Sequence, residues 1–373
     1  MPKLTSAALA LDAIRGSAAR HALGYADLFR RFVHLYRARR FSPYEIHFFD
    51  LLNPAFSDQA LDNFMSRDEG IDLDRRHVLE TYLCVTSDKT VFYAMCAAAG
   101  VPVPGLLAVF DLPSGWTPGG RLLRSQAEWR EFMRSLPQEF VVKPALGLLG
   151  KGVTVFRREQ DAFVAHDGPR RNPDQLYEFL CRGKKQNLFA AGFSHYSLRL
   201  PGESHKAIIQ QRIRAHPAIA QLSGSDALST CRIVTQAGGS GDSRVLASAI
   251  KVISGGNLVD NFDKGTLGNL WCNIDAASGR ITEAFVKDGP VDRLTRITRH
   301  PGTGHEIAGF AIPDWDRVVH LAHHLAAVFR PQPLIHWDIG VATGGPVVIE
   351  GNVGGQTMVT PLSRPVRELL AGR

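Results

Sequence analysis

The chain has 373 residues, of which 45% are hydrophobic, so it is large enough to bury a sizeable core and to form two or three subdomains. No apolar stretch approaches the ~20 residues that span a bilayer, Asp12 and Arg15 interrupt the N-terminal apolar run, and the five cysteines form no C-x-x-C pair. These features argue against a transmembrane segment, a signal peptide, a disulfide framework and a zinc site, so we expect a cytoplasmic protein whose net charge of +7 favours anionic partners.

Residues 1 to about 80 are predicted to be mainly helical, with turn signals at Ser42-Pro43 and Asn53-Pro54. The segment "YADLFRRFVHLYRARRF" interleaves arginines with apolar residues at helical spacing. A basic amphipathic helix of this kind can lie on an anionic membrane, but we favour the alternative of a capping helix that packs its apolar face on the main domain. No nucleic-acid motif accompanies it, so we expect no nucleic-acid binding.

From Ser87 onwards the pattern changes to alternating helices and strands. Ser87 or Asp88 is a candidate N-cap for a helix that Gly100 closes, and a strand follows the Val-Pro-Val-Pro passage. The stretch "SQAEWREFMRSL" predicts the next helix.

A glycine loop joins two strands in "FVVKPALGLLGKGVTVF". Glycines leave backbone N–H groups free to face an anion, and Lys151 adds a positive charge. The loop is not a Walker A motif, because Ala145 occupies the position of its first glycine and Gly152 that of its Ser/Thr. Phosphate binding and a plain hairpin turn both remain open on this pattern alone.

The strands "AIIQQRI", "STCRIVTQ" and "RVLASAIKVISG" follow and predict an antiparallel middle of an α+β protein. Gln210 and Gln211 are adjacent in a strand, so only one of them can line a cleft. Charged side chains on such apolar strands, as at Lys143, Arg232 and Lys251, are costly to bury without an anion, although an internal salt bridge would serve as well as a ligand.

The segment "LIHWDIGVATGGPVVIEGN", residues 334–352, predicts a β-hairpin that turns near Gly344. In that register Asp338 lies across from Glu350, and Asn352 projects from the same face. Neighbouring buried carboxylates call for a cation, and this all-oxygen set is typical of a magnesium site. The alternatives are solvated carboxylates or pairing of each with an arginine.

The chain resembles the ATP-grasp superfamily over roughly residues 85–355. The resemblance lies in an ordered set of features: Lys143, the glycine loop with Lys151, "QQRI", Arg232, Asp338 and Glu350-x-Asn352. At finer grain the chain resembles the sugar-transfer-associated ATP-grasp subfamily, which is related to α-L-glutamate ligases. The motifs that carry this second resemblance are "ARRFSPYEI", "IIQQRIRAHPAIA", "STCRIVT", "NFDKGTLGN", "RHPGTG", "HWDIG" and "GPVVIEGN". His336 departs from the pattern, since subfamily members often have glycine there.

The resemblance implies an ATP-grasp fold in which two α+β subdomains grip ATP. We expect a mainly helical N-terminal region at residues 1–84, a first ATP-grasp part with the glycine loop at 85–205, and a second part with the metal hairpin at 206–373.

It also implies roles for individual residues. The residues that would contact the nucleotide are Lys89, Lys143, Gly150, Lys151, Gly152, Gln210, Gln211, Arg212 and Ile213. Arg232 would act on the terminal phosphate, and Asn261 would lie near the γ-phosphate and metal. Lys251 would contact a phosphate or would instead face an acceptor or a carboxylate. Asp338, Glu350 and Asn352 would hold one or two Mg²⁺ ions.

The implied activity is an ATP- and Mg²⁺-dependent carboxylate–amine ligase that forms an amide or peptide bond through an acyl phosphate. Its substrates would be small-molecule carboxylates and amines, and by analogy with the subfamily a sugar-linked or amino-acid substrate is expected. A kinase that phosphorylates a small acceptor is one alternative. A catalytically inactive nucleotide-binding scaffold is the other, docked on a membrane or on sugar-transfer machinery through the basic N-terminus.

Overall fold

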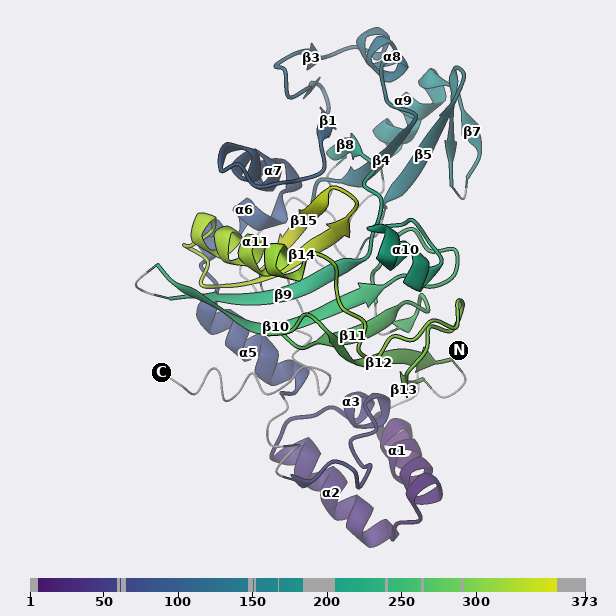
Figure 1. Cartoon of the computed structure of the whole chain (residues 1–373), viewed down its shortest axis with the longest axis vertical. Coiled ribbons are helices and arrows are strands. Elements are labelled where there is room, and N and C mark those ends of the chain that lie inside the picture. The colour runs from purple at the N-terminus through teal and green to yellow at the C-terminus, as the bar shows by residue number, and fades with distance from the viewer. Residues whose placement is uncertain are drawn as a thin grey trace.

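Two antiparallel sheets and an N-terminal group of helices make up the described part of the chain (Figure 1). The computed structural model describes residues 6–58, 61, 65–146, 150, 152–166, 168–183, 205–238, 241–262, 265–289 and 292–353. The prediction of an α+β protein is confirmed. No helix within these ranges is both long and apolar enough to cross a membrane.

The N-terminal helices pack into a module of their own. They are α1 (Ser6–His21), α2 (Tyr25–Arg37) and α3 (Pro43–Phe48), which share one hydrophobic core, and α5 (Arg67–His77) follows them along the chain. Helix α3 begins where predicted, because Ser42 and Glu45 form a capping box and Pro43 occupies the first turn. The apolar face of α2, formed by Leu28, Phe32 and Leu35, is buried against α1 and α3. The prediction that this face packs on the main domain is therefore wrong, because the N-terminal helices bury it in a core of their own.

An eight-stranded sheet follows, preceded by η1 (Glu80–Tyr82), α6 (Cys84–Ser87) and α7 (Lys89–Ala98), whose predicted N-cap is Asp88. Its strands run in the order β3-β2-β1-β8-β4-β5-β6-β7. Helices α8 (Gln126–Arg134) and α9 (Pro173–Arg182) pack on one face over an aromatic core. The strand bounds are Leu106–Phe110 (β1), Gly115–Trp116 (β2), Leu122–Leu123 (β3), Glu139–Pro144 (β4), Thr154–Glu159 (β5), Ala162–Ala165 (β6), Arg170–Arg171 (β7) and Ala207–Gln211 (β8).

The seven-stranded sheet has the order β13-β12-β11-β10-β9-β14-β15. It is entered through α10 (Pro217–Ser223), and α11 (Trp315–Val328) packs on one of its faces. The strand bounds are Thr230–Ala237 (β9), Ser243–Val252 (β10), Leu270–Ile274 (β11), Ile281–Asp288 (β12), Arg293–Ile297 (β13), Leu334–Ala342 (β14) and Gly345–Asn352 (β15).

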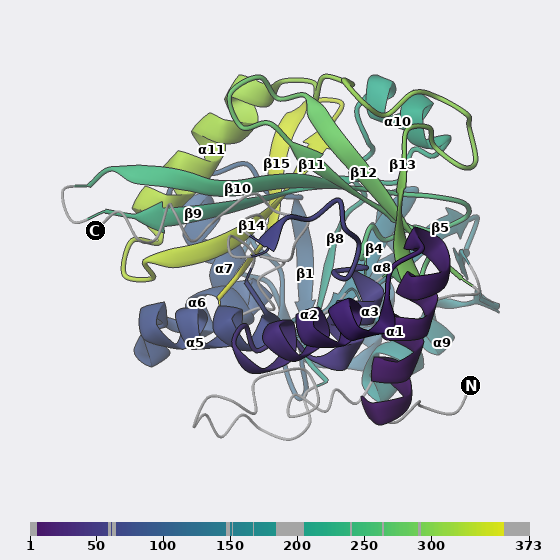
Figure 2. The same ribbon diagram turned by 90° about the horizontal axis from the view of Figure 1, so that it is seen from below.

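The two faces of this sheet differ in character. Ile233 and Trp337 lie on the face that α11 covers, and strand alternation therefore places Arg232 and Asp338 on the other face. Phe48 of α3 packs on that second face, against Ala249 and other residues of β10 to β13. The N-terminal module thus borders the face of the sheet that carries the polar residues, as seen from below in Figure 2.

Candidate functional site

The predicted hairpin and its register are confirmed. Asp338 of β14 pairs with Glu350 of β15, and a bulge follows between Asp338 and Ile339. The Asn352 side chain donates to Glu350 Oε1 over 3.2 Å, so it lies on the face of Glu350 as expected. The three oxygen-bearing side chains of the sequence motif therefore meet at one place.

Protein cations already neutralise Asp338. Arg232, its cross-strand neighbour on β9, donates from Nε to Oδ1 over 2.6 Å and from Nη2 to Oδ2 over 2.9 Å. Lys251 Nζ lies 3.2 Å from Oδ2. Burial alone would raise the pKa of Asp338, but Arg232 and Lys251 outweigh it and hold that pKa below its ordinary value. Of the alternatives that the sequence left open, the internal salt bridge is the one formed here.

Asp260 is a further carboxylate that sequence reasoning missed. It lies 3.6 Å from Lys251 Nζ, and its Oδ2 accepts hydrogen bonds from the Thr230 backbone N–H (2.7 Å) and hydroxyl (2.5 Å). Burial raises its pKa, although Lys251 opposes the shift. Asn261, the predicted residue beside it, was the signal that could have drawn attention to Asp260.

A second cluster joins both sheets to α7. Lys89 Nζ lies 3.6 Å from Glu350 Oε2, and Lys143 of β4 donates to the Tyr93 hydroxyl over 2.8 Å. That hydroxyl lies 3.2 Å from Gln210 Oε1 and 3.1 Å from the Ile349 carbonyl oxygen. No residue pattern singled out Tyr93, yet it is the group through which Lys143 reaches the hairpin.

The structure separates the two glutamines. Gln210 is buried in the cluster around Tyr93, whereas Gln211 is exposed. Burial and the charge of Lys89 lower the pKa of Lys143 to about 7, with Glu350 opposing. His336 is buried on the same face as Asp338, and burial together with Arg232 lowers its pKa to about 3, so its ring is neutral at pH 7.

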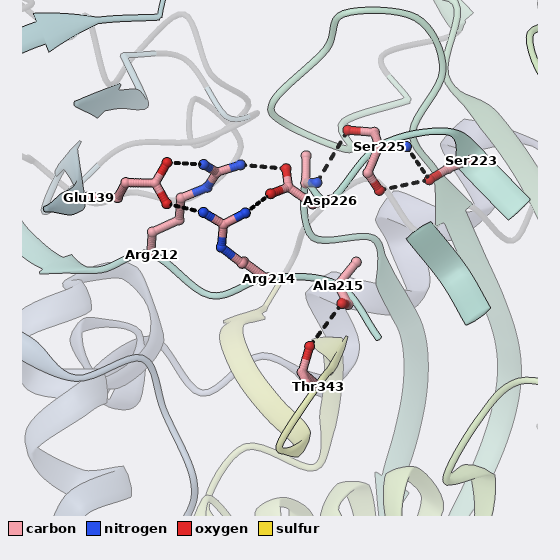
Figure 3. Close-up of polar contacts among 9 residues, drawn as sticks. Glu139, Arg212, Arg214, Ala215, Ser223, Ser225, Asp226 and Thr343 are labelled. Carbon is pink, nitrogen blue, oxygen red and sulfur yellow. Dashed lines mark hydrogen bonds and ion pairs between the residues drawn. The ribbon is translucent and has the colours of Figure 1, made fainter. Parts of the chain in front are cut away.

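The connection between the two sheets is held by ion pairs (Figure 3). Strand β8 ends at Gln211, so Arg212 and Ile213 lie beyond the strand that was predicted to include them. Arg212 contacts Glu139 and Asp226 over 2.6 Å each, and Arg214 pairs with the same two carboxylates. The Arg212 side chain is therefore held by ion pairs between β4 and the loop after α10. We call this connection between the two sheets, with Glu139, Arg212, Arg214 and Asp226, the hinge.

The glycine loop approaches the second sheet. Gly150 and Gly152 have φ of +66° and +83°, a region that favours glycine. A Cβ added to Gly150 would lie 3.7 Å from Val259 and 3.8 Å from Asn261, so Gly150 lies close to the segment that follows β10 of the other sheet. Lys151 lies outside the described residues.

The chemistry of the hairpin residues fits a hard divalent cation, because carboxylate and amide oxygens are the ligands that Mg²⁺ accepts. Their charges are however compensated by Arg232, Lys251 and Lys89. Across the described ranges no three His, Cys, Asp or Glu side chains are grouped so as to hold an ion. The residues that could bind a metal are thus present, but lysine and arginine side chains of the protein pair with their carboxylates.

Two sheets joined by a short hinge, with basic side chains and carboxylates converging where they meet, define an ATP-grasp protein. The sequence profile of one family matches residues 73–363, which is more than half of the chain. The chain belongs to the sugar-transfer associated ATP-grasp family. The expected fold and family are therefore confirmed.

The solved structures that resemble the chain include a D-alanine–D-alanine ligase from Helicobacter pylori, with 10% identity, a TM-score of 0.40 and coverage of 77% of this chain and 60% of that one. A D-alanyl-alanine synthetase A from Vibrio cholerae has 11% identity, a TM-score of 0.38 and coverage of 78% and 61%. An L-amino acid ligase from Bacillus licheniformis has 14% identity, a TM-score of 0.36 and coverage of 74% and 42%. The chain spans less than two thirds of each of these three proteins, and likeness at this level carries no argument about activity. A search of curated proteins found no match.

Proposed function

We propose that this protein is an ATP- and Mg²⁺-dependent carboxylate–amine ligase that forms an amide bond through an acyl phosphate. The observation that carries the proposal is the convergence of four basic side chains, Lys89, Lys143, Arg232 and Lys251, on the hairpin that bears Asp338 and Glu350. Phosphoryl transfer needs little from the protein beyond positioning and charge neutralisation, and this cluster offers both.

The ion pairs of the cluster suggest how ligand binding proceeds. Buried charges need partners, and here the lysines, the arginine and the carboxylates serve as partners for one another. A triphosphate offers the basic side chains a second anion, and Mg²⁺ offers the carboxylates a second cation. Each ligand alone would leave half of the cluster uncompensated, so we expect ATP and Mg²⁺ to bind together.

In the proposed reaction the γ-phosphoryl group passes to a substrate carboxylate, which gives an acyl phosphate and ADP. The amine then attacks the acyl carbon, phosphate leaves, and the amine loses a proton. Lys143 and Lys89 would hold the phosphates, Arg232 would neutralise the charge on the transferred group, and Asp338, Glu350 and Asn352 would hold the metal. The glycine loop at Gly150 would exclude water that hydrolyses the acyl phosphate.

Calorimetric titration of ATP with and without Mg²⁺ tests this proposal. The parent should bind ATP tightly only with Mg²⁺, and Glu350→Gln should weaken that binding by at least about tenfold, or about 1.4 kcal/mol. Glu306→Gln is the matched control, because Glu306 is exposed and forms its ion pair with Arg299 at the surface. No ATP binding by the parent would refute the proposal, whereas Mg²⁺-dependent ATP binding without ADP release on any tested substrate pair would favour the inactive nucleotide-binding scaffold.

The products separate a ligase from a kinase. With a panel of carboxylates and amines, a ligase should release ADP and phosphate and form an amide only when both substrates are present. A stable phosphorylated acceptor formed without an amine would instead identify a kinase.

A further inference from the structure

The four most exposed large hydrophobic side chains of the described chain lie on helices α1 and α2. They are Tyr25 (63% exposed), Phe29 (58%), Leu11 (52%) and Tyr36 (51%). An exposed apolar side chain is ordinary when isolated, but a group of them on one element marks an interaction surface.

Three of these residues form a stripe along α2. Tyr25, Phe29 and Tyr36 are spaced four and seven residues apart, which places them on one side of a helix. This stripe borders the buried side of α2, where Leu28, Phe32 and Leu35 complete the core of the module, and the Tyr36 ring stacks on that of Phe32. The helix therefore has more apolar surface than its packing against the described residues uses.

A row of positive charge adjoins the stripe. By helical spacing, Arg30 and Arg37 lie on the side of the stripe away from the buried face, and both are exposed. Arg30 pairs with Asp27 over 2.5 Å, so the excess positive charge of this surface comes from Arg37. The other arginines of residues 25–40 lie elsewhere, because Arg39 is buried and Arg40 pairs with Asp72. The surface thus combines aromatic side chains with a net positive charge.

We propose that this α2 surface, made of Tyr25, Phe29, Tyr36, Arg30 and Arg37, docks on the surface of an anionic lipid bilayer. Tyrosine and phenylalanine rings partition into the interface between headgroups and acyl chains, and arginines beside them pair with acidic headgroups. Because the arginines of this surface are positively charged, we expect it to bind a bilayer with acidic headgroups more tightly than a neutral bilayer.

The position of α2 in the molecule suits this role. Helices α1 and α2 lie at the end of the molecule opposite the eight-stranded sheet (Figure 1). Because α3 carries the contact between the module and the seven-stranded sheet, the α2 surface can meet a bilayer without unpacking the fold.

Co-sedimentation of the full chain with lipid vesicles tests the proposal. We expect binding to vesicles of phosphatidylcholine mixed with phosphatidylglycerol, little binding to phosphatidylcholine alone, and a decline with added salt. The triple variant Tyr25→Ser/Phe29→Ser/Tyr36→Ser should lower the partition coefficient at least about tenfold, and Arg30→Gln/Arg37→Gln several-fold with a weaker salt dependence.

A matched control carries the same kind of change elsewhere. Tyr82→Ser/Leu122→Ser/Leu267→Ser removes three exposed apolar side chains outside α2 and should bind vesicles like the parent. Equal binding to neutral and acidic vesicles, or parent-like binding of the α2 triple variant, would overturn the proposal. A third result would also overturn it: the parent does not bind vesicles but forms dimers, and the α2 triple variant is monomeric. That result would assign the surface to contact with a second copy of the chain.

Discussion

Lys143 shows how much of this site depends on single contacts. The lysine is buried in β4, and its ammonium donates to the Tyr93 hydroxyl, which in turn lies within hydrogen-bond distance of Gln210 and the Ile349 carbonyl. A hydroxyl has one hydrogen to donate, so Tyr93 accepts from Lys143 and donates to one of these two acceptors. Tyr93 is therefore the positioning residue for Lys143.

Removing that hydroxyl tests its role. In Tyr93→Phe the buried ammonium loses its acceptor, and loss of one such hydrogen bond typically costs about 1–2 kcal/mol. We expect ATP affinity to fall roughly 5- to 30-fold with little change in secondary structure. Tyr82→Phe, at an exposed tyrosine, should leave ATP affinity unchanged. Equal affinities of Tyr93→Phe and the parent in calorimetry would mean that Lys143 needs no positioning.

The lowered pKa of Lys143 predicts a pH dependence. With a pKa of about 7, Lys143 is mostly neutral at pH 8 in the free protein. A bound triphosphate favours the charged form and raises the pKa, so ATP binding should take up close to one proton at pH 8, and affinity should fall as pH rises above 7. Calorimetry in buffers of different ionisation enthalpy measures this uptake. Lys143→Met should abolish it, and uptake that persists in this variant would assign the proton to another group.

At the scale of single residues, the sequence predicted which side chains lie together where a local pattern, such as the alternation of a hairpin, determines it. Asp338, Glu350 and Asn352 were predictable because a hairpin has a fixed alternation around its turn. Tyr93 and Asp260 were not, because each acquires its role from a side chain 50 or 9 residues away, Lys143 or Lys251. A tyrosine inside an apolar helix gives no local sign of such a contact.

At the scale of secondary-structure elements, the order of the strands within each sheet could not be predicted from local sequence patterns. The alternation within β9, β10 and β14 was readable from the sequence, but the placing of β9 between β10 and β14 was not. That order puts Arg232 beside Asp338, 106 residues along the chain, and so decides that the carboxylate has a protein counter-ion. The resemblance to a known family, not periodicity, supplied the correct fold.

The hinge between the sheets offers a test at this scale. Glu139 and Asp226 share the same two arginines, so the four charges form one network rather than independent pairs. Because these groups are partly exposed, we expect Glu139→Gln to lower the free energy of unfolding by about 1 kcal/mol and Asp226→Asn by less. The effects in the double variant should not add.

Urea unfolding of the two single variants and the double variant measures this coupling. Glu131→Gln is the control, because Glu131 pairs with Arg121 at the surface outside the hinge and should change stability little. Strictly additive losses in the double variant would show that Glu139 and Asp226 act independently.

On the scale of the whole molecule, the N-terminal module is tied to the face of the sheet that carries the site. Phe48 of α3 is buried in a cluster with Ala249, Phe262, Trp271 and Leu294. Ala249 is the cross-strand partner of Arg232, and Trp271 that of Lys251. The matched family profile begins at residue 73, so helices α1 to α3 lie outside the matched region although they pack on the sheet that carries the site.

Phe48→Ala should weaken the contact between α3 and the seven-stranded sheet. Truncating a buried phenylalanine costs about 3 kcal/mol or more, and because the cluster around Phe48 joins α3 to the sheet, the loss should fall on that contact. We expect the thermal midpoint to drop by several degrees and cleavage sites in residues 6–58 to become accessible to a protease while the two sheets stay protected. Phe29→Ala, an exposed phenylalanine of the same module, should change the midpoint little. If Phe48→Ala instead unfolds in one transition with uniform cleavage, the module and the sheets form a single cooperative unit, and the N-terminal helices are as much a part of the fold as the strands that carry Arg232 and Lys251.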